Sequence, residues 1–156
     1  MEWPRIIHIS PCELLLHQHL KGFSMGSWAI GSLENDTALD WLSELVESPD
    51  ANIIRITLSR IKEPLPELSK CIALEEARAA AEVVACWLGH PPPEPKRAGL
   101  VIWAQQHLVI TPEIIALAQD AAVIIMQQWA LLDYRNEADM AECLASISNL
   151  QNRLLN

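Results

Sequence analysis

Aromatic residues other than tryptophan are scarce in this chain, which has one tyrosine and one phenylalanine among its 156 residues. Its four cysteines form no Cys-x-x-Cys pair, the spacing common to zinc sites and thiol redox centres. The N-terminal stretch lacks the unbroken apolar segment of a signal peptide. The most apolar region, residues 114–132, has no uninterrupted apolar run longer than 121–126, too short for a transmembrane helix. These absences predict a cytoplasmic protein with free thiols and no membrane segment.

Positive charge is also in short supply. Eleven Lys and Arg face twenty Asp and Glu, so the net charge is −9. A surface of this sign argues against nucleic acid or an anionic membrane as a partner. The hydrophobic fraction of 51% makes disorder of the whole chain implausible. A chain of this length can bury about 70% of its unfolded surface, which favours one globular domain.

Helical signals dominate the first half. Asn35 or Asp36 is expected to cap a first helix, and Ser48 with Pro49 at the first helical position should begin a second. Residues 53–61 fit either a strand or a helix, and the preceding start signal favours the helix. Residues 62–68 contain two prolines and are expected to be a connection.

The second half has four further helical signals. A long helix is predicted from about Ile72 to Leu88, ended by Gly89, and a short one over residues 100–107. Thr111 and Pro112 form a strong start for a helix reaching about residue 132. The last helix is predicted over residues 137–155. The sequence therefore predicts an all-α fold, a single compact domain of about five or six helices with an irregular N-terminal motif segment.

The stretch from Met25 to Trp41 is the most specific part of the chain. It reads M-G-S-W-A-I-G-S-L-E-N-D-T-A-L-D-W, and it resembles the opening of a bacterial family known as domain of unknown function 4259. The resemblance implies a helical domain and a start at Met25, but no activity. Ala29 and Leu33 depart from the glycine and phenylalanine common at these places in the family. The residues that carry the motif are Gly26, Trp28, Gly31, Glu34, Asn35, Asp36, Asp40 and Trp41.

Two segments follow from that resemblance. Residues 25–156 are expected to form the helical domain. Residues 1–24 are expected to be a dispensable extension or a mis-assigned start. His17 and His19 lie in this extension, and two imidazoles without a third ligand are weak evidence for zinc.

Acids gather around the start of the first expected helix. Glu34, Asp36 and Asp40 could bind a divalent metal, but acids also favour helix N-termini because of the partial positive charge there. No calcium-loop spacing is present, so no metal or other cofactor is predicted. Gly26 and Gly31 have the separation of a phosphate loop, but the Lys and Ser/Thr that should follow are missing. The glycines are instead expected to allow turns with positive φ beside Trp28.

Glu82 is the most informative single acid, because alanines at 79, 80, 81 and 85 surround it on the long helix. It could be a catalytic or ligand-binding carboxylate. It could equally face solvent, or accept hydrogen bonds from the backbone of residues 25–33 or the Trp28 indole. His107, on the short helix, is expected to be partly buried rather than a ligand.

No catalytic motif occurs in the chain. The prediction is a small, acidic cytoplasmic protein-interaction module without enzymatic activity, for example one that binds a basic partner as an immunity protein masks a toxin. The alternative is a small-ligand or metal-dependent enzyme that uses Glu34, Asp36 and Glu82. The oligomeric state is left open.

Overall fold

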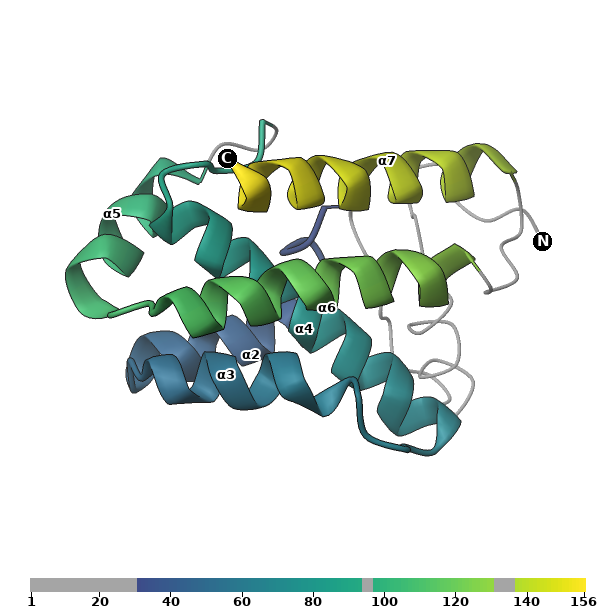
Figure 1. Ribbon diagram of the computed structural model, residues 1–156, viewed down its shortest axis with the longest axis horizontal. Helices are drawn as coiled ribbons and strands as arrows, with labels where there is room; N and C mark the ends of the chain where they lie inside the picture. The colour runs from purple at the N-terminus through teal and green to yellow at the C-terminus, as the bar shows by residue number, and fades with distance from the viewer. Residues whose placement is uncertain (1–30, 94–96, 131–136) are drawn as a thin grey trace.

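The computed structural model describes residues 31–93, 97–130 and 137–156. These residues form an all-α single domain, as the sequence predicts, and no strand occurs in the described ranges. None of the helices described here is both long and apolar enough to cross a bilayer. Following the labels of Figure 1, the helices are α2 (Asp36–Glu47), α3 (Ala51–Arg60), α4 (Glu67–Trp87), α5 (Ala98–His107), α6 (Pro112–Ala130) and α7 (Glu137–Leu155).

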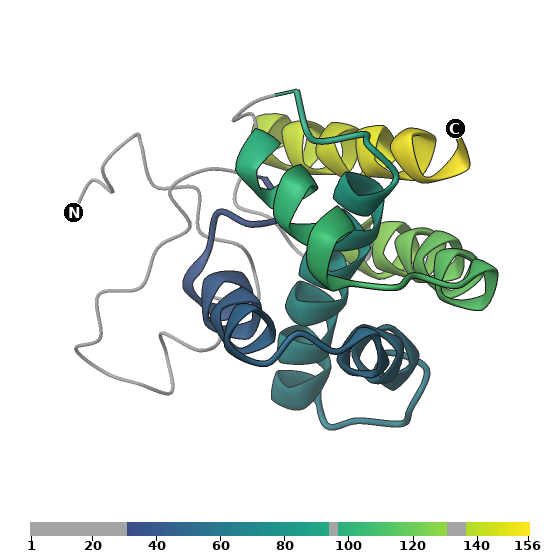
Figure 2. The ribbon, with the colours of Figure 1, turned by 90° about the vertical axis from the view of Figure 1, so that its left-hand side faces the viewer.

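Helix α4 is the centre of the fold. It contacts α2, α3, α5, α6 and α7. In Figure 2 it runs between α2 on one side and α3 and α6 on the other. A helix with neighbours on all sides must be apolar or small around its whole circumference. The alanines at 77, 79, 80, 81 and 85 meet this requirement and are completely buried.

Most of the helices begin or end where a nearby residue satisfies the free backbone groups of the helix end. The Asn35 side chain accepts a hydrogen bond from the Ala38 N–H at 2.8 Å and caps α2, as predicted. Thr111 caps α6 in the same way, with its hydroxyl 3.3 Å from the Ile114 nitrogen. Gly89 has φ +86°. Its N–H donates to the Cys86 carbonyl, and the His90 N–H donates to the Ala85 carbonyl, each at 2.9 Å. This double closure is the predicted glycine end of α4.

The predicted start of the second helix is wrong. Asp50, not Ser48, is the cap of α3, and its carboxylate accepts from the Asn52 N–H at 2.9 Å. Ser48 still belongs to the end of α2, because its N–H donates to the Glu44 carbonyl at 3.1 Å. Pro49 therefore lies between the helices. The ambiguous residues 53–61 are helical through Arg60.

Helix α4 begins about one turn before its predicted start. Pro66 occupies the cap position with an extended ψ of 156°, and Glu67 is the first helical residue. Proline is compatible with this position because the first amide groups of a helix have no intrahelical acceptor. The connection therefore ends at Pro66. Helix α7 has the predicted bounds, and α6 extends to Ala130.

Candidate functional site

Three ionisable residues follow one side of the buried helix α4. Glu75, Arg78 and Glu82 are three and four residues apart, the spacing of neighbours on a helix surface. Their exposed fractions are only 1%, 3% and 1%. Burying a charge is costly unless it is paired and hydrogen-bonded. The partners of these three side chains therefore determine how α4 is held.

Each of the three reaches a different part of the fold. Glu75 accepts from the Asn35 amide at 2.8 Å, which ties α4 to the cap of α2. Arg78 donates to the Ser146 hydroxyl of α7 at 2.9 Å. Glu82 pairs with Arg153 near the end of α7. The buried charges thus join α2, α4 and α7.

Glu82 and Arg153 form a two-point ion pair. The Arg153 Nη2 donates to Glu82 Oε1 at 3.0 Å, and Nη1 donates to the other carboxylate oxygen. The same guanidinium also reaches the Asn149 side-chain oxygen at 2.6 Å and the His90 carbonyl at 3.1 Å. The His90 Nδ1 lies 3.0 Å from the Arg153 carbonyl oxygen. Arg153 therefore fixes the loop after α4 against α7.

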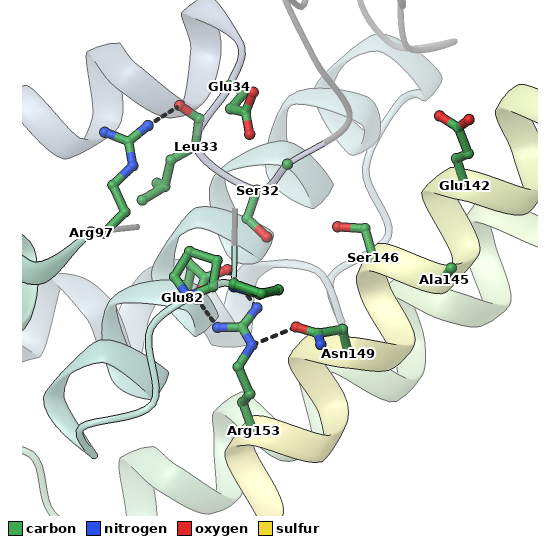
Figure 3. A pocket seen from close by; sticks show the side chains of 13 residues that line it. Ser32, Leu33, Glu34, Glu82, Arg97, Glu142, Ala145, Ser146, Asn149 and Arg153 are labelled. Carbon is green, nitrogen blue, oxygen red and sulfur yellow. Dashed lines mark hydrogen bonds and ion pairs between the residues drawn. The ribbon is translucent and has the colours of Figure 1, made fainter. Parts of the chain in front are cut away.

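A pocket of about 400 Å³ opens beside this pair. Figure 3 shows its two main walls: the turn before α2, which carries Ser32 and Glu34, and the side of α7 that runs from Glu142 to Arg153. Pro92, Pro93 and Arg97 complete the lining. Of the three acids that the sequence suggests for an enzyme site, Glu34 and Glu82 line this pocket and Asp36 does not.

Glu34 differs from Glu82 in that its carboxylate has no partner among the described residues. The described residues place no hydrogen-bond donor or salt-bridge cation on it. Burial raises the pKa of Glu34, against the opposing effect of the Arg97 and Arg78 charges. Its N–H donates to the Gly31 carbonyl at 3.2 Å, which closes the turn. A Cβ on Gly31 would collide with the Glu34 carboxylate, so the glycine lets the side chain fold back over the turn.

Ser32 is the second unpartnered polar side chain of the pocket. It is only 5% exposed, yet its hydroxyl has no hydrogen-bond partner among the described residues. In Figure 3 this side chain points from the turn into the space beside Arg153, while Ser146 points toward it from α7. A hydroxyl that faces an open volume can form a hydrogen bond with a ligand.

The other motif residues have separate places. Asp36 and Asp40 do not line the pocket, and Asp40 is exposed on α2. Trp41 is buried, and its indole N–H donates to the Thr57 hydroxyl at 3.0 Å. Nowhere in the described ranges do three or more His, Cys, Asp or Glu come together as metal ligands would. Gly26, Trp28, His17, His19 and the boundary at residue 24 lie outside the described residues, as does the predicted bond between Glu82 and Trp28.

Sequence reasoning missed Arg153, the partner that Glu82 has. The available signal was a lone cation in the last turn of α7, beside the apolar stripe of that helix. Solvent exposure of Glu82 is excluded by its burial. His107 is exposed rather than partly buried, and its ring stacks on Trp103 with the centroids 5.4 Å apart.

The cysteines near the site offer no nucleophile. Cys71, Cys86 and Cys143 are buried. Burial, reinforced by the Glu82 charge, raises the pKa of Cys86 to about 12. The thiolate is the reactive form of cysteine, so Cys86 stays unreactive near neutral pH.

Comparisons with known proteins give one match. The sequence model of the family described as "Domain of unknown function (DUF4259)" matches residues 26–145. That range includes the pocket turn but ends within α7 at residue 145, so it leaves out Ser146, Asn149 and Arg153. No curated protein and no solved structure matches the chain.

Proposed function

Since the chain belongs to the DUF4259 family, whose description assigns no activity, we propose a function from its own side chains: a non-enzymatic module of the cytoplasm that binds a basic protein. Binding and masking of a toxin, as immunity proteins do, is one concrete form of this function. The observation that carries the proposal is the acidic surface of α2, which forms no salt bridge with any other described residue.

Helix α2 has acids but no Lys or Arg. Asp40, Glu44 and Glu47 recur at intervals of four and three residues, which places them on one face, and all three are exposed. Asp36 continues the row toward the pocket turn. No cation of the described residues forms a salt bridge with any of these acids.

This arrangement does not help α2 to fold. Like charges four residues apart destabilise a helix, and acids near its C-terminus oppose the helix dipole. Glu44 also acts on its neighbour Glu76 in α4: burial raises the pKa of Glu76, the Arg60 charge opposes this, and the Glu44 charge adds to the rise. A surface that holds repelling charges gains most from a partner that brings positive charge.

The experiment is a pull-down with the full-length chain as bait. We expect one basic protein in stoichiometric amount from a lysate of the source organism, released by raised salt because exposed charges are screened. A bait with Asp40→Asn, Glu44→Gln and Glu47→Gln should lose this partner. A matched bait with three exposed acids neutralised elsewhere, Glu63→Gln, Glu67→Gln and Glu113→Gln, should retain it.

The alternative function is a small-ligand or metal-dependent enzyme that uses Glu34, Asp36 and Glu82. Glu34 and Glu82 share the pocket, and this is the observation in its favour. Native mass spectrometry of the purified chain separates the two. A bound metal or metabolite without a protein partner supports the enzyme, and capture that is indifferent to the α2 substitutions contradicts the interaction module proposed here.

A further inference from the structure

We infer that the pocket beside the Glu82–Arg153 pair receives a guanidinium group, and that the group is an arginine side chain of the basic partner. This inference rests on the proposed function and names the part of the partner that the pocket recognises. Three properties of the pocket carry it: its unsatisfied acceptors, its charge and the side chains that line it.

The acceptors come from both walls. Glu34 offers two carboxylate oxygens without a donor among the described residues, and the Ser32 hydroxyl, which also lines the pocket, has no hydrogen-bond partner among them either. Across the pocket, the Ser146 hydroxyl accepts one bond from Arg78 and keeps further acceptor capacity. A ligand that supplies several donors from one rigid group satisfies these atoms together.

The charge of the pocket favours a cation. Arg153 is neutralised by its two-point contact with Glu82, so this pair contributes little net charge. Of the remaining charged side chains, Glu34 and Glu142 are negative and Arg97 is positive. Arg97 donates toward the Leu33 carbonyl at 3.4 Å. The remaining excess charge of the lining is therefore negative.

The side chains that line the pocket favour a guanidinium group over an ammonium group. A guanidinium has five donors in a planar fork that matches a carboxylate at two points, whereas an ammonium is a compact and strongly hydrated charge. The apolar surfaces of Leu33, Pro92 and Pro93 provide contact for the methylene stem of the side chain. Glu34 would bind the fork while Ser32 and Ser146 take the outer N–H groups.

The test uses a small probe, so that no partner is needed. N-acetyl-arginine methylamide is titrated into the full chain while backbone amide shifts are followed by NMR. We expect saturable shifts at Ser32, Glu34 and Ser146. The citrulline analogue, the neutral isostere, should cause none, and the lysine analogue should bind more weakly. Glu34→Gln should weaken arginine binding at least about tenfold, because a hydrogen bond to a charged group is lost. Ser32→Ala should weaken it less, and Glu113→Gln, at an exposed acid of α6, should leave it unchanged.

Several results of the titration would contradict the inference. Equal shifts with the arginine and citrulline analogues, stronger binding of inorganic phosphate, or unchanged affinity in a folded Glu34→Gln protein would overturn the assignment. Lysine binding as tight as arginine would overturn the guanidinium preference. If the pull-down yields a basic protein but the probe does not bind, this inference fails and the proposed function stands. If the probe binds selectively but no basic protein is captured, the proposed function fails instead.

Discussion

The carboxylate of Glu82 and the guanidinium of Arg153, 71 positions apart in the chain, meet in a buried two-point ion pair between α4 and α7. The Glu82 side chain is 2% exposed and that of Arg153 is 13% exposed. The pair thus lines the pocket and joins α4 to the pocket wall that α7 provides.

Removing one member of this pair should be far more damaging than removing both. Glu82→Ala leaves a nearly buried guanidinium uncompensated and should lower the free energy of unfolding by about 3–5 kcal/mol. Glu82→Gln keeps one acceptor oxygen and should cost less. The double variant Glu82→Leu/Arg153→Met replaces charge by apolar packing and should recover most of the loss. Chemical denaturation of the three variants measures these differences, and a double variant as unstable as Glu82→Ala would show that packing, not charge, dominates here.

Asn35 should contribute more to the stability of the fold than its neighbour Asp36. Its side chain caps α2 and also donates to the buried Glu75 carboxylate at 2.8 Å. Asn35→Ala removes both bonds and should cost about 2 kcal/mol or more. Asp36→Ala loses only a favourable charge at the helix start, about 0.3–1 kcal/mol. Asn35→Asp keeps the cap but places a carboxylate against Glu75. Equal denaturation midpoints for Asn35→Ala and Asp36→Ala would contradict this division of roles.

The helix ends could be predicted from the sequence because their chemistry is local. Asn35, Thr111 and Gly89 satisfy backbone groups within a few residues of themselves, so their residue types are sufficient evidence. The start of α3 was predicted wrongly from the same kind of local chemistry. Ser48 and Asp50 are both good caps, and the choice between them depended on α2 still holding Ser48 in its last turn.

The partners of buried charges could not be predicted in this way. The spacing of Glu75, Arg78 and Glu82 places them on one side of a helix, and the surrounding alanines indicate that Glu82 is close to other elements. Which residue faces each of them depends on how α7 packs on α4. Glu82 and Arg153 are too far apart in sequence for any local pattern to join them. The pocket depends on the same packing, so only its individual acids were foreseen.

A matched pair of glycine substitutions tests the end of α4. Gly89 has φ +86°, which an L-residue with a side chain adopts at a cost of about 1–2 kcal/mol. A Cβ there would lie 3.8 Å from the nearest atom, so the cost is conformational and not steric. Gly89→Ala should therefore destabilise the protein. Gly99→Ala, within α5 and with no atom near its Cβ, should be neutral or stabilising by up to about 1 kcal/mol. Thermal or chemical unfolding measures the change in stability of each variant. A change of the same sign in both would contradict the left-handed backbone conformation of Gly89 at the end of α4.

Glu34 should make stability depend on pH in a direction opposite to that of a salt-bridged acid. Burial raises its pKa in the folded protein above the ordinary value of 4.5. The folded state therefore takes up a proton more readily than the unfolded state. Below pH 4.5 the group is protonated in both states and its contribution to stability is fully present. As the pH rises through the folded pKa, that contribution is lost, because the unfolded state ionises at less cost.

The side chain that Glu34→Gln introduces is neutral at every pH, so this variant should not lose stability as the pH rises. We expect the variant to be more stable than the original chain near neutral pH, with the difference shrinking as the pH falls toward the ordinary value of the carboxyl. Unfolding free energies of both proteins across the acidic range provide the measurement. Glu113→Gln is the control, since that acid is exposed in the first turn of α6. A Glu34→Gln protein that is less stable at neutral pH and equal in acid would mean that a donor stabilises the carboxylate. Glu34 would then not be free to bind a guanidinium.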